Sequence, residues 1–435
     1  GTACRNGTIE SVANITKQSP TGSDPLNVRG DFPVVNETVF LNTPYISPTP
    51  TPAINATNQF LMAKARDPLQ LGDMLAETKA VREKIAKMVH ADPGEIGMLS
   101  STSEGENIVA NSMNLQAGDN VVIDDLHYTT SLVLYSKLAE STGVEIRIVR
   151  NKDGVADTES FAEMVDDKTK LISVAWVSNR NGYRHDLESL ATLAHAHGSY
   201  LYVDAIQGVG MLNLDIKKSG VDFLTAGSYK WLLGGFGIAP FYVREDVMDI
   251  IRPDRYGWRM VQDRLSEYHY KIFSDARKFG YATPAFGAVY QLSASLDYLL
   301  QVGVENIENH TVPLANRLQT ELAKQGFQVL TPPDNKSAIV AFKHGADYEK
   351  ISKQIDESGL RLSFRENNEQ IRVGIALFNN MEEVDIFLDI TEEVCPMTFV
   401  KTKLIIEKMM RGQTLEIKLK GKEPLENVPS NIKAN

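Results

Sequence analysis

Apolar helical stretches alternate with short β-rich runs along most of the chain, from Val39 to Leu300. Two of the helical stretches, Glu77 to Val89 and Leu187 to His197, carry apolar residues at helical spacing along one side. The β-rich runs are Asn120 to Asp124, Glu145 to Val149, Lys170 to Val177, Tyr200 to Asp204, Asp222 to Ala226 and Ile238 to Val243. Strands separated by helix-length segments predict an α/β domain whose mostly parallel sheet is covered by helices on both faces.

The order of the predicted elements changes after Leu300, to helix, strand, strand, helix and strand. These elements are Val304 to Gln325, Gln328 to Leu330, Ser337 to Phe342, Asp347 to Ser358 and Gln370 to Ile375. They predict a smaller α+β domain. Beyond Leu388 we expect a partial α+β unit that begins with a short strand and continues into a helix after Cys395-Pro396. The expected divisions are an N-terminal tail with a small-domain segment, the large domain, the small domain and the C-terminal unit, at residues 1–38, 39–300, 301–387 and 388–435.

Composition narrows the range of functions. The 435 residues carry a formal net charge of −11 and no basic stripe, so we expect no nucleic-acid partner. No run of about 18 apolar residues occurs, so we expect no membrane-spanning helix. Cys4 and Cys395 are the only cysteines, which favours a reducing compartment such as the cytoplasm, and we predict no bound metal. The polar stretch Gly1 to Asp24 is expected to be poorly ordered, and as a remnant of a removed export signal it would instead indicate an exported form.

Lys230 is the strongest candidate for a catalytic residue. It follows the apolar strand Asp222 to Ala226 and precedes the glycine-rich run Leu233 to Gly237. A lysine just past a buried strand, followed by glycines that let the backbone approach a ligand, suits imine formation. A single lysine is more often a solvated surface charge. Asp204 ends another strand, where its carboxylate would pair with a protonated pyridine nitrogen or act as a helix N-cap.

Three further segments complete the outline of a cofactor site. Ser101 to Gly105 lies where a loop enters a helix, so that its hydroxyls and free amides would bind a phosphate or form a capping box. His127 and Tyr128 follow a strand, and either ring would stack on a planar cofactor or serve core packing. Asn179, in the turn Ser178 to Gly182, would donate to a ring oxygen or simply support the turn.

From Val39 to about Phe387 the chain resembles the class V aminotransferase superfamily, which includes cysteine desulfurases, selenocysteine lyases and isopenicillin N epimerase-like proteins. The segment Thr225 to Trp231 is similar to that family's Schiff-base segment, with Tyr229 where many members have histidine. The resemblance implies a fold-type I pyridoxal 5'-phosphate (PLP) enzyme in which Lys230 holds the cofactor as a Schiff base and acts as the base. The other residues that it places at the cofactor are Thr102, Ser103, His127, Tyr128, Asn179, Asp204, Gln207, Ser228, Tyr229 and Thr283.

The same resemblance assigns roles within this set. Thr102, Ser103 and Ser228 would contact the phosphate, and Gln207 the ring face or its oxygen. The segment that contains Thr283, Tyr281 to Pro284, resembles one that reaches the phosphate of a neighbouring subunit, which implies a homodimer with a shared active site.

The substrate side is also assigned by the resemblance. Arg372 resembles the arginine that clamps the substrate α-carboxylate, a task that suits a bidentate guanidinium, although alone it would be interpreted as a surface arginine. Asn42 would line the substrate side of the site. The expected substrate is therefore an amino acid.

Two parts of the chain, the stretch before Arg372 and the C-terminal unit, bear on which reaction the chain catalyses. Typical desulfurases of this family carry a nucleophilic cysteine shortly before the carboxylate arginine, but the stretch Ser358 to Asn367 has none. The C-terminal unit resembles the start of TusA/SirA-like sulfur-carrier domains, and it places Cys395 at a helix N-terminus, where a thiol becomes more acidic. A lone cysteine is otherwise a small buried hydrophobe.

The leading hypothesis is cleavage of a carbon–sulfur bond in cysteine or a cysteine conjugate, with sulfur received by Cys395 or by a sulfur-acceptor protein. One alternative is an isopenicillin N epimerase-like epimerase or an aminotransferase. Another is a non-catalytic scaffold with a PLP-enzyme fold.

Overall fold

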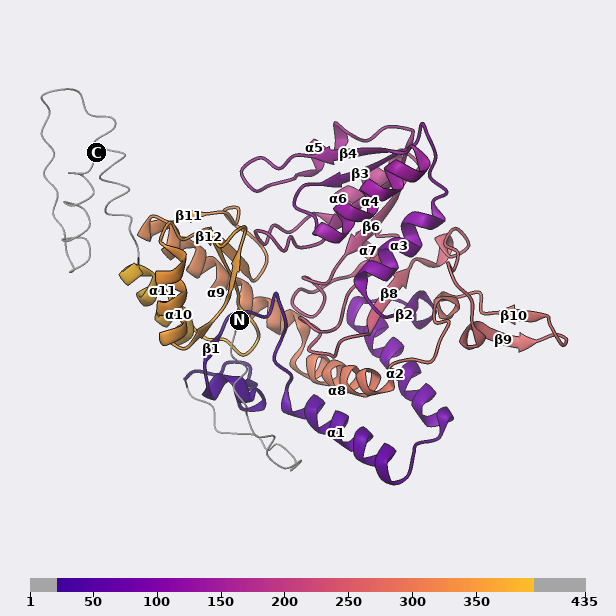
Figure 1. Ribbon diagram of the computed structural model, residues 1–435, viewed down its shortest axis with the longest axis horizontal. Helices are drawn as coiled ribbons and strands as arrows, with labels where there is room; N and C mark the ends of the chain where they lie inside the picture. Colours follow the sequence, from indigo (N-terminus) through magenta and orange to yellow (C-terminus); the bar gives the residue numbers. More distant parts are fainter. Residues whose placement is uncertain (1–21, 395–435) are drawn as a thin grey trace, which may run out of the picture.

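A seven-stranded sheet forms the centre of the larger unit within residues 22–394, which are the residues that the computed structural model describes. Its strand order is β2-β8-β7-β6-β5-β3-β4 (Figure 1). The strands are β2 (Ile96–Leu99), β3 (Asn120–Asp124), β4 (Glu145–Val149), β5 (Thr169–Ala175), β6 (Tyr200–Asp204), β7 (Phe223–Thr225) and β8 (Ala239–Val243). Neighbouring strands are parallel except at β8, which is antiparallel to both β2 and β7. The predicted α/β class with a mostly parallel sheet is confirmed.

Helices cover both faces of this sheet because successive strand residues point to opposite sides. In β3, Val121 and Ile123 belong to one apolar cluster together with Ile108 of α3. Val122 between them belongs to a second cluster, together with Leu190 of α6. The helices of the larger unit are α1 (Thr51–Arg66), α2 (Leu71–Val89), α3 (Thr102–Ser112), α4 (Thr129–Thr142), α5 (Thr158–Ala162), α6 (Leu187–Ala196), α7 (Ile216–Ser219) and α8 (Phe286–Val302).

Short helical turns and a hairpin connect these elements. The 3₁₀ turns are η1 (Arg29–Asp31), η2 (Pro33–Asn36), η3 (Pro93–Glu95), η4 (Glu245–Val247), η5 (Trp258–Met260) and η6 (Ala276–Phe279). The antiparallel pair of β9 (Val261–Arg264) and β10 (Tyr270–Ile272) projects away from the larger unit in Figure 1. None of the helices within residues 22–394 combines the length and apolar character needed to span a bilayer.

The smaller unit contains a four-stranded antiparallel sheet of order β11-β12-β15-β14. Its strands are β11 (Gln328–Val329), β12 (Ile339–Lys343), β14 (Ser363–Arg365) and β15 (Gln370–Gly374), and its helices are α9 (Val304–Gln325), α10 (Tyr348–Glu357) and α11 (Met381–Val394). A separate parallel pair joins β1 (Val39–Phe40) to β13 (Leu360–Arg361), so a segment from the start of the chain contributes to this unit.

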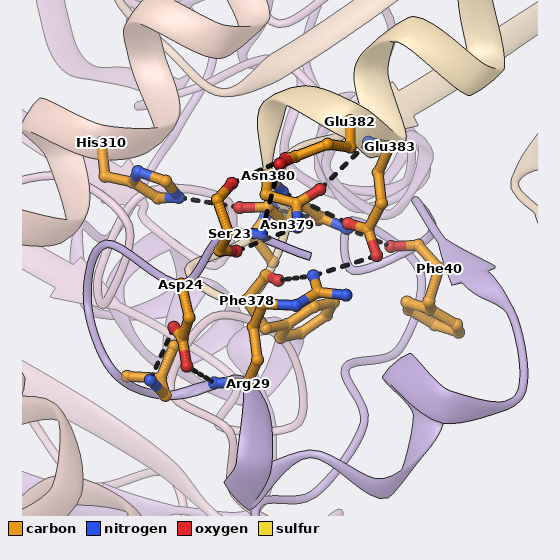
Figure 2. A network of polar contacts seen from close by, with 12 residues as sticks. Ser23, Asp24, Arg29, Phe40, His310, Phe378, Asn379, Asn380, Glu382 and Glu383 are labelled. Carbon is orange, nitrogen blue, oxygen red and sulfur yellow. Dashed lines mark hydrogen bonds and ion pairs between the residues drawn. The ribbon is translucent and has the colours of Figure 1, made fainter. Parts of the chain in front are cut away.

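A buried polar network fixes the N-terminal segment to the start of α11 (Figure 2). Arg29 Nη1 donates to Glu383 Oε1 at 3.0 Å and to the carbonyl oxygen of Phe378. Asn379 Nδ2 donates to Glu383 Oε2 at 2.8 Å and to the carbonyl oxygen of Phe40 at 3.0 Å. The strand β1 is therefore held by β13, with which it pairs, and by Asn379 at the start of α11. These contacts position the loop that follows β1.

Two expectations about the chain ends need correction. Ser23 and Asp24 do not belong to a poorly ordered stretch, because Ser23 Oγ donates to Glu382 Oε2 at 2.6 Å and Asp24 accepts the Arg29 amide at 3.0 Å. The short strand expected between Leu388 and Cys395 is wrong, because α11 runs on to Val394. Phe387, Leu388 and Thr391 are buried, a helical spacing that packs one face of α11 on the small unit. The remaining expectations for residues 1–21 and 395–435, Cys395 included, lie outside the described residues.

Candidate active site

Lys230 and Asp204 lie near the carboxyl ends of two adjacent parallel strands. Asp204 ends β6 and pairs in register with Thr225, the last residue of β7. Lys230 follows five residues later in the chain and is only 9% exposed. Burial lowers the pKa of Lys230 to about 8, although the charge of Asp204 opposes this. Lys230 thus provides a neutral amine close to physiological pH, as a nucleophile or base requires.

Asp204 is a buried carboxylate that has need of a cationic partner. It is 5% exposed, and its Oδ1 accepts the amide of Ile206 at 3.0 Å. Burial raises the pKa of Asp204 to about 6, while the Ile206 amide and the charge of Lys230 lower it. A protonated ring nitrogen placed against Asp204 would compensate the cost of burying its charge.

The N-terminus of α3 forms an anion-binding end beside Lys230. Ser101 is the N-cap, and its Oγ accepts the Glu104 amide at 3.2 Å, so the first helical residues, Thr102 and Ser103, have amides with no partner inside the helix. Thr102 Oγ1 accepts the amide of Gly227 at 2.9 Å and thereby ties the helix to the loop that carries Lys230.

Helix α3 packs closely against β7 at Gly105, and the loop that carries Lys230 turns tightly after Ser228. A Cβ at Gly105 would lie 2.2 Å from Thr225 Oγ1, so α3 can reach β7 only with glycine there. Ser228, fully buried, donates its hydroxyl to the carbonyl oxygen of Gly235 at 2.6 Å, which closes the glycine-rich turn after Lys230. For its predicted phosphate contact, the Ser228 hydroxyl would have to rotate away from Gly235 and donate to the phosphate.

Arg372 is a buried guanidinium with free hydrogen-bonding capacity. It lies on β15, is 2% exposed, and its Nη1 donates to the carbonyl oxygen of Asn179 at 2.8 Å. Its Nε and Nη2 are buried and have no partner among residues 22–394. Burial and the nearby charge of Arg365 lower the pKa of Arg372 to about 9. A bidentate carboxylate would satisfy both free nitrogens and the charge.

Asn42 is joined to the strands that carry Arg372 and Ser363, and its predicted contact with the substrate stays a prediction. It forms a parallel bridge with Gly374, two residues beyond Arg372 on β15. Its Oδ1 accepts the hydroxyl of Ser363, which is directly opposite Arg372 in the register of β14 and β15. The loop after β1 is thereby placed over the predicted substrate side.

The two candidate stacking residues differ in their surroundings. His127 is fully buried, with Nε2 at 3.1 Å from Ser173 Oγ and with Nδ1 accepting the Tyr128 amide at 2.8 Å. Burial lowers the pKa of His127 to about 4. Tyr128 is 45% exposed and lines a cavity of about 400 Å³ together with Asn179. Tyr128 therefore faces open space and His127 does not, and the contact of either ring with the cofactor stays a prediction.

Gln207, Tyr229 and Thr283 have different structural positions. Gln207 Nε2 donates to the Pro44 carbonyl oxygen at 2.9 Å and its Oε1 accepts Trp231 Nε1 at 2.8 Å, so Gln207 connects the loop after β1 to the Lys230 loop. The Tyr229 ring stacks on Phe236 at 4.6 Å between ring centroids. Thr283 is exposed on the wall of a different cavity, of about 520 Å³. Its predicted contact with a second subunit stays a prediction.

Glu106 is a buried polar residue of the site region that the sequence reasoning missed. It lies on α3, is 2% exposed, and accepts the hydroxyls of Ser131 at 2.7 Å and Ser173 at 2.9 Å. Burial raises its pKa to about 7, and the charge of Asp204 adds to this rise. The signal in the sequence is an acidic residue three positions before the buried Val109, on the inner face of the helix.

The residues fit PLP. A buried lysine of depressed pKa, a buried carboxylate without a cationic hydrogen-bond partner, and a capped helix N-terminus with free amides match its aldehyde, pyridine nitrogen and phosphate. Asn179 Oδ1 is also buried and unpartnered, so this amide is available to the ring oxygen once its orientation is reversed. Within residues 22–394 no group of three or more His, Cys, Asp and Glu residues is arranged to hold a metal ion.

Comparisons with known proteins show what the chain as a whole is similar to. The family described as aminotransferase class-V matches residues 39–387, and the family described as sulfurtransferase TusA matches residues 386–435. The chain is 27% identical to a probable cysteine desulfurase of Methanothermobacter thermautotrophicus, over 85% of this chain and 98% of that protein. It is 30% identical to a cysteine desulfurase of Haloferax volcanii, over 71% of this chain and 76% of that protein. The solved apo cysteine desulfurase of Thermococcus onnurineus has a TM-score of 0.78 at 25% identity, and the match covers 86% of this chain and 99% of that one.

Proposed function

This chain belongs to the aminotransferase class-V family, and we propose that it is a PLP-dependent enzyme that breaks a carbon–sulfur bond in cysteine or a cysteine conjugate. When bound, PLP supplies an electron sink for the carbanion formed at the substrate Cα. Lys230 Nζ would provide the covalent attachment and, once freed, the base for the Cα proton. Asp204 would hold the proton on the pyridine nitrogen, and Arg372 would orient the α-carboxylate.

One observation carries this proposal. The buried Nε and Nη2 of Arg372 are unpartnered within residues 22–394, and the charge of Arg372 lowers the pKa of Lys230. The guanidinium that would bind a substrate carboxylate, Arg372, thus lies close enough to the buried amine of Lys230 to change its pKa. This is what a base that acts on the α-carbon of an amino acid requires.

The sulfur part of the proposal rests on the second family match, at residues 386–435, and on the Cys395-Pro396 pair within it. The thiolate of Cys395 would receive the sulfur and hand it to an acceptor protein. The two-cysteine composition leads us to propose a reducing compartment, the cytoplasm. The resemblance of the segment Tyr281 to Pro284 to one that reaches the phosphate of a neighbouring subunit supports a homodimer, and Thr283 of this segment is exposed.

A second candidate function follows from a different observation. The segment between α10 and β15 contains no cysteine, so it offers no thiol to attack a substrate sulfur directly. An epimerase or aminotransferase would need only Lys230, Asp204 and Arg372. In that case Cys395 would have no part in the reaction.

The test is an absorbance titration of the purified holoprotein with L-cysteine and with L-alanine, combined with sulfide and persulfide assays. Wild type and Cys395→Ser are compared, and Lys230→Ala serves as the control that should lose the imine absorbance while it stays folded. In wild type we expect alanine and a protein-bound persulfide from L-cysteine, because attack of the Cys395 thiolate on the substrate sulfur breaks the carbon–sulfur bond, and we expect neither product in Cys395→Ser. A shift of the band without sulfur release would refute carbon–sulfur cleavage of cysteine and favour the second candidate.

A further inference from the structure

A second arginine shares the face of the small sheet that carries Arg372. In the antiparallel pair of β14 and β15, Ser363 lies directly opposite Arg372, and Arg365 lies two residues along the same strand. Residues directly opposite one another, and residues two apart on one strand, point to the same face of a sheet. Arg365 is therefore a diagonal neighbour of Arg372 on the face that Asn42 and Ser363 also occupy.

The Arg365 guanidinium is not engaged by the protein. It is half-buried, and no hydrogen-bond, ion-pair or ring partner for its side chain occurs among residues 22–394. Its charge is felt by both Lys230 and Arg372, whose pKa values it lowers, so the three cations lie within electrostatic reach of one another. The two guanidinium groups on this face, Arg365 and Arg372, repel each other, and a bound anion would relieve this repulsion.

A polar cavity provides the space for such an anion. It measures about 400 Å³, and Tyr128, Asn179, Arg180, Arg365 and Asn368 line it. Arg180 Nη1 lies 3.5 Å from Glu366 Oε1, so these two charges balance and Arg365 remains. Asn179 is shared with the carboxylate clamp, because its carbonyl oxygen accepts Arg372 Nη1. The cavity therefore adjoins the place where the α-carboxylate would bind.

The turn after Arg365 fixes its position. Glu366, Asn367 and Asn368 have φ values of 48°, 54° and 68°, a run of left-handed residues that turns the chain from β14 directly into β15. This turn occupies the chain position where desulfurases of the family carry their nucleophilic cysteine.

We propose that Arg365 forms a second anion subsite, and that the substrate is an amino acid whose side chain ends in an acid group. The inference rests on the proposed function, because it assumes that Arg372 binds the α-carboxylate. A cysteine conjugate with a distal carboxylate and a cysteine with an oxidised, anionic sulfur share this chemistry. Cysteine itself does not use the subsite.

The experiment is an absorbance titration of the holoprotein with pairs of amino acids that match in shape and differ in charge. The pairs are L-aspartate with L-asparagine and L-glutamate with L-glutamine, and L-cysteine sulfinate is the arm that distinguishes an anionic sulfur from a carboxylate. We expect at least one acid to have a Kd about tenfold or more below that of its amide, because a charge-assisted hydrogen bond is lost with the amide. The preference should weaken as ionic strength rises, since the subsite is half-exposed.

Arg365→Gln should remove the preference for the acid over its amide, while L-alanine still shifts the cofactor band. Arg361→Gln is the matched control, because Arg361 belongs to the neighbouring strand β13 and lies 3.5 Å from Asp356 rather than in the cavity. Calorimetric titration with succinate and with butyrate gives a readout that needs no reaction. Succinate should bind more tightly than butyrate in wild type and not in Arg365→Gln.

The outcomes separate the two proposals. If no amino acid, L-alanine included, shifts the cofactor band, the proposed function fails. If L-alanine and L-cysteine shift it but neither acid is preferred over its amide, only the second anion subsite is wrong. Retention of the preference in Arg365→Gln would also overturn the assignment to Arg365.

Discussion

Replacement of Glu106 with Gln tests how much a buried carboxyl group beneath the site reduces stability at alkaline pH. Burial raises the pKa of Glu106 from the usual 4.5 to about 7. A raised pKa means that the folded state holds this proton more tightly than the unfolded state. The resulting stability is fully present below about pH 4.5 and is lost as the pH rises through about 7. Because each pKa unit corresponds to about 1.4 kcal/mol, the loss amounts to about 3 kcal/mol at pH 8.5.

Gln has nearly the volume of Glu and does not ionise, so the variant should lack this pH-dependent contribution. Urea unfolding of wild type and Glu106→Gln at pH 5 and pH 8.5 measures it. The stability of the variant relative to wild type should improve by about 2.5 kcal/mol between the two pH values, because a small part of the contribution is already lost at pH 5. Other groups that titrate, such as Asp204 and His127, are present in both proteins and largely cancel. Glu83→Gln, at a half-exposed position paired with Lys79 at 2.7 Å, is the control and should show almost no such change. An equal difference between variant and wild type at both pH values would refute the reasoning.

Three further predictions concern the lysine, the terminal network and the packing of α3. With apoprotein, the rate of imine formation from added PLP should rise about tenfold per pH unit and level off near pH 8, because burial lowers the pKa of Lys230 to about 8. Stopped-flow absorbance measures this rate, and a rise that continues to pH 10 would contradict the prediction. Arg29→Met should lower the free energy of unfolding by about 3–5 kcal/mol by leaving Glu383 buried without its partner, and Arg29→Met/Glu383→Gln should regain part of the loss in the same urea assay. Gly105→Ala should cost about 1–3 kcal/mol and weaken PLP binding, because its Cβ would overlap Thr225 Oγ1, whereas Gly72→Ala, with no atom within 4 Å, should show neither effect.

The parallel sheet could be predicted because its strands are buried on both faces. The first and last residues of β3, β4 and β6 are those predicted from the sequence. Because parallel strands end at the same edge of a sheet, the sequence also predicts that Asp204 and Lys230 lie near each other. The short β2 contains Gly97 and could not be identified from alternation, and β14 is mostly polar.

The substrate side could be predicted only where a family motif marks it. Arg372 and Asn42 belong to such motifs, and the structure brings them together. Arg365 and Glu106 do not, and their importance depends on what long-range folding places around them. The mistaken strand beyond Leu388 arose because a short apolar-rich run fits either the helical or the strand period, and only the packing of α11 on the small unit distinguishes the two.

The contact between Arg29 and Glu383 joins residues 354 positions apart, and this has a consequence for synthesis on the ribosome. At about 5–20 residues per second, Arg29 leaves the ribosome roughly 20–70 s before Glu383 does. During this interval β1 also lacks its partner strand β13 and the amide of Asn379. The larger unit can meanwhile assemble, but the loop that carries Asn42 is fixed only when the last described helix emerges. Completion of the substrate side therefore requires translation to have passed α11.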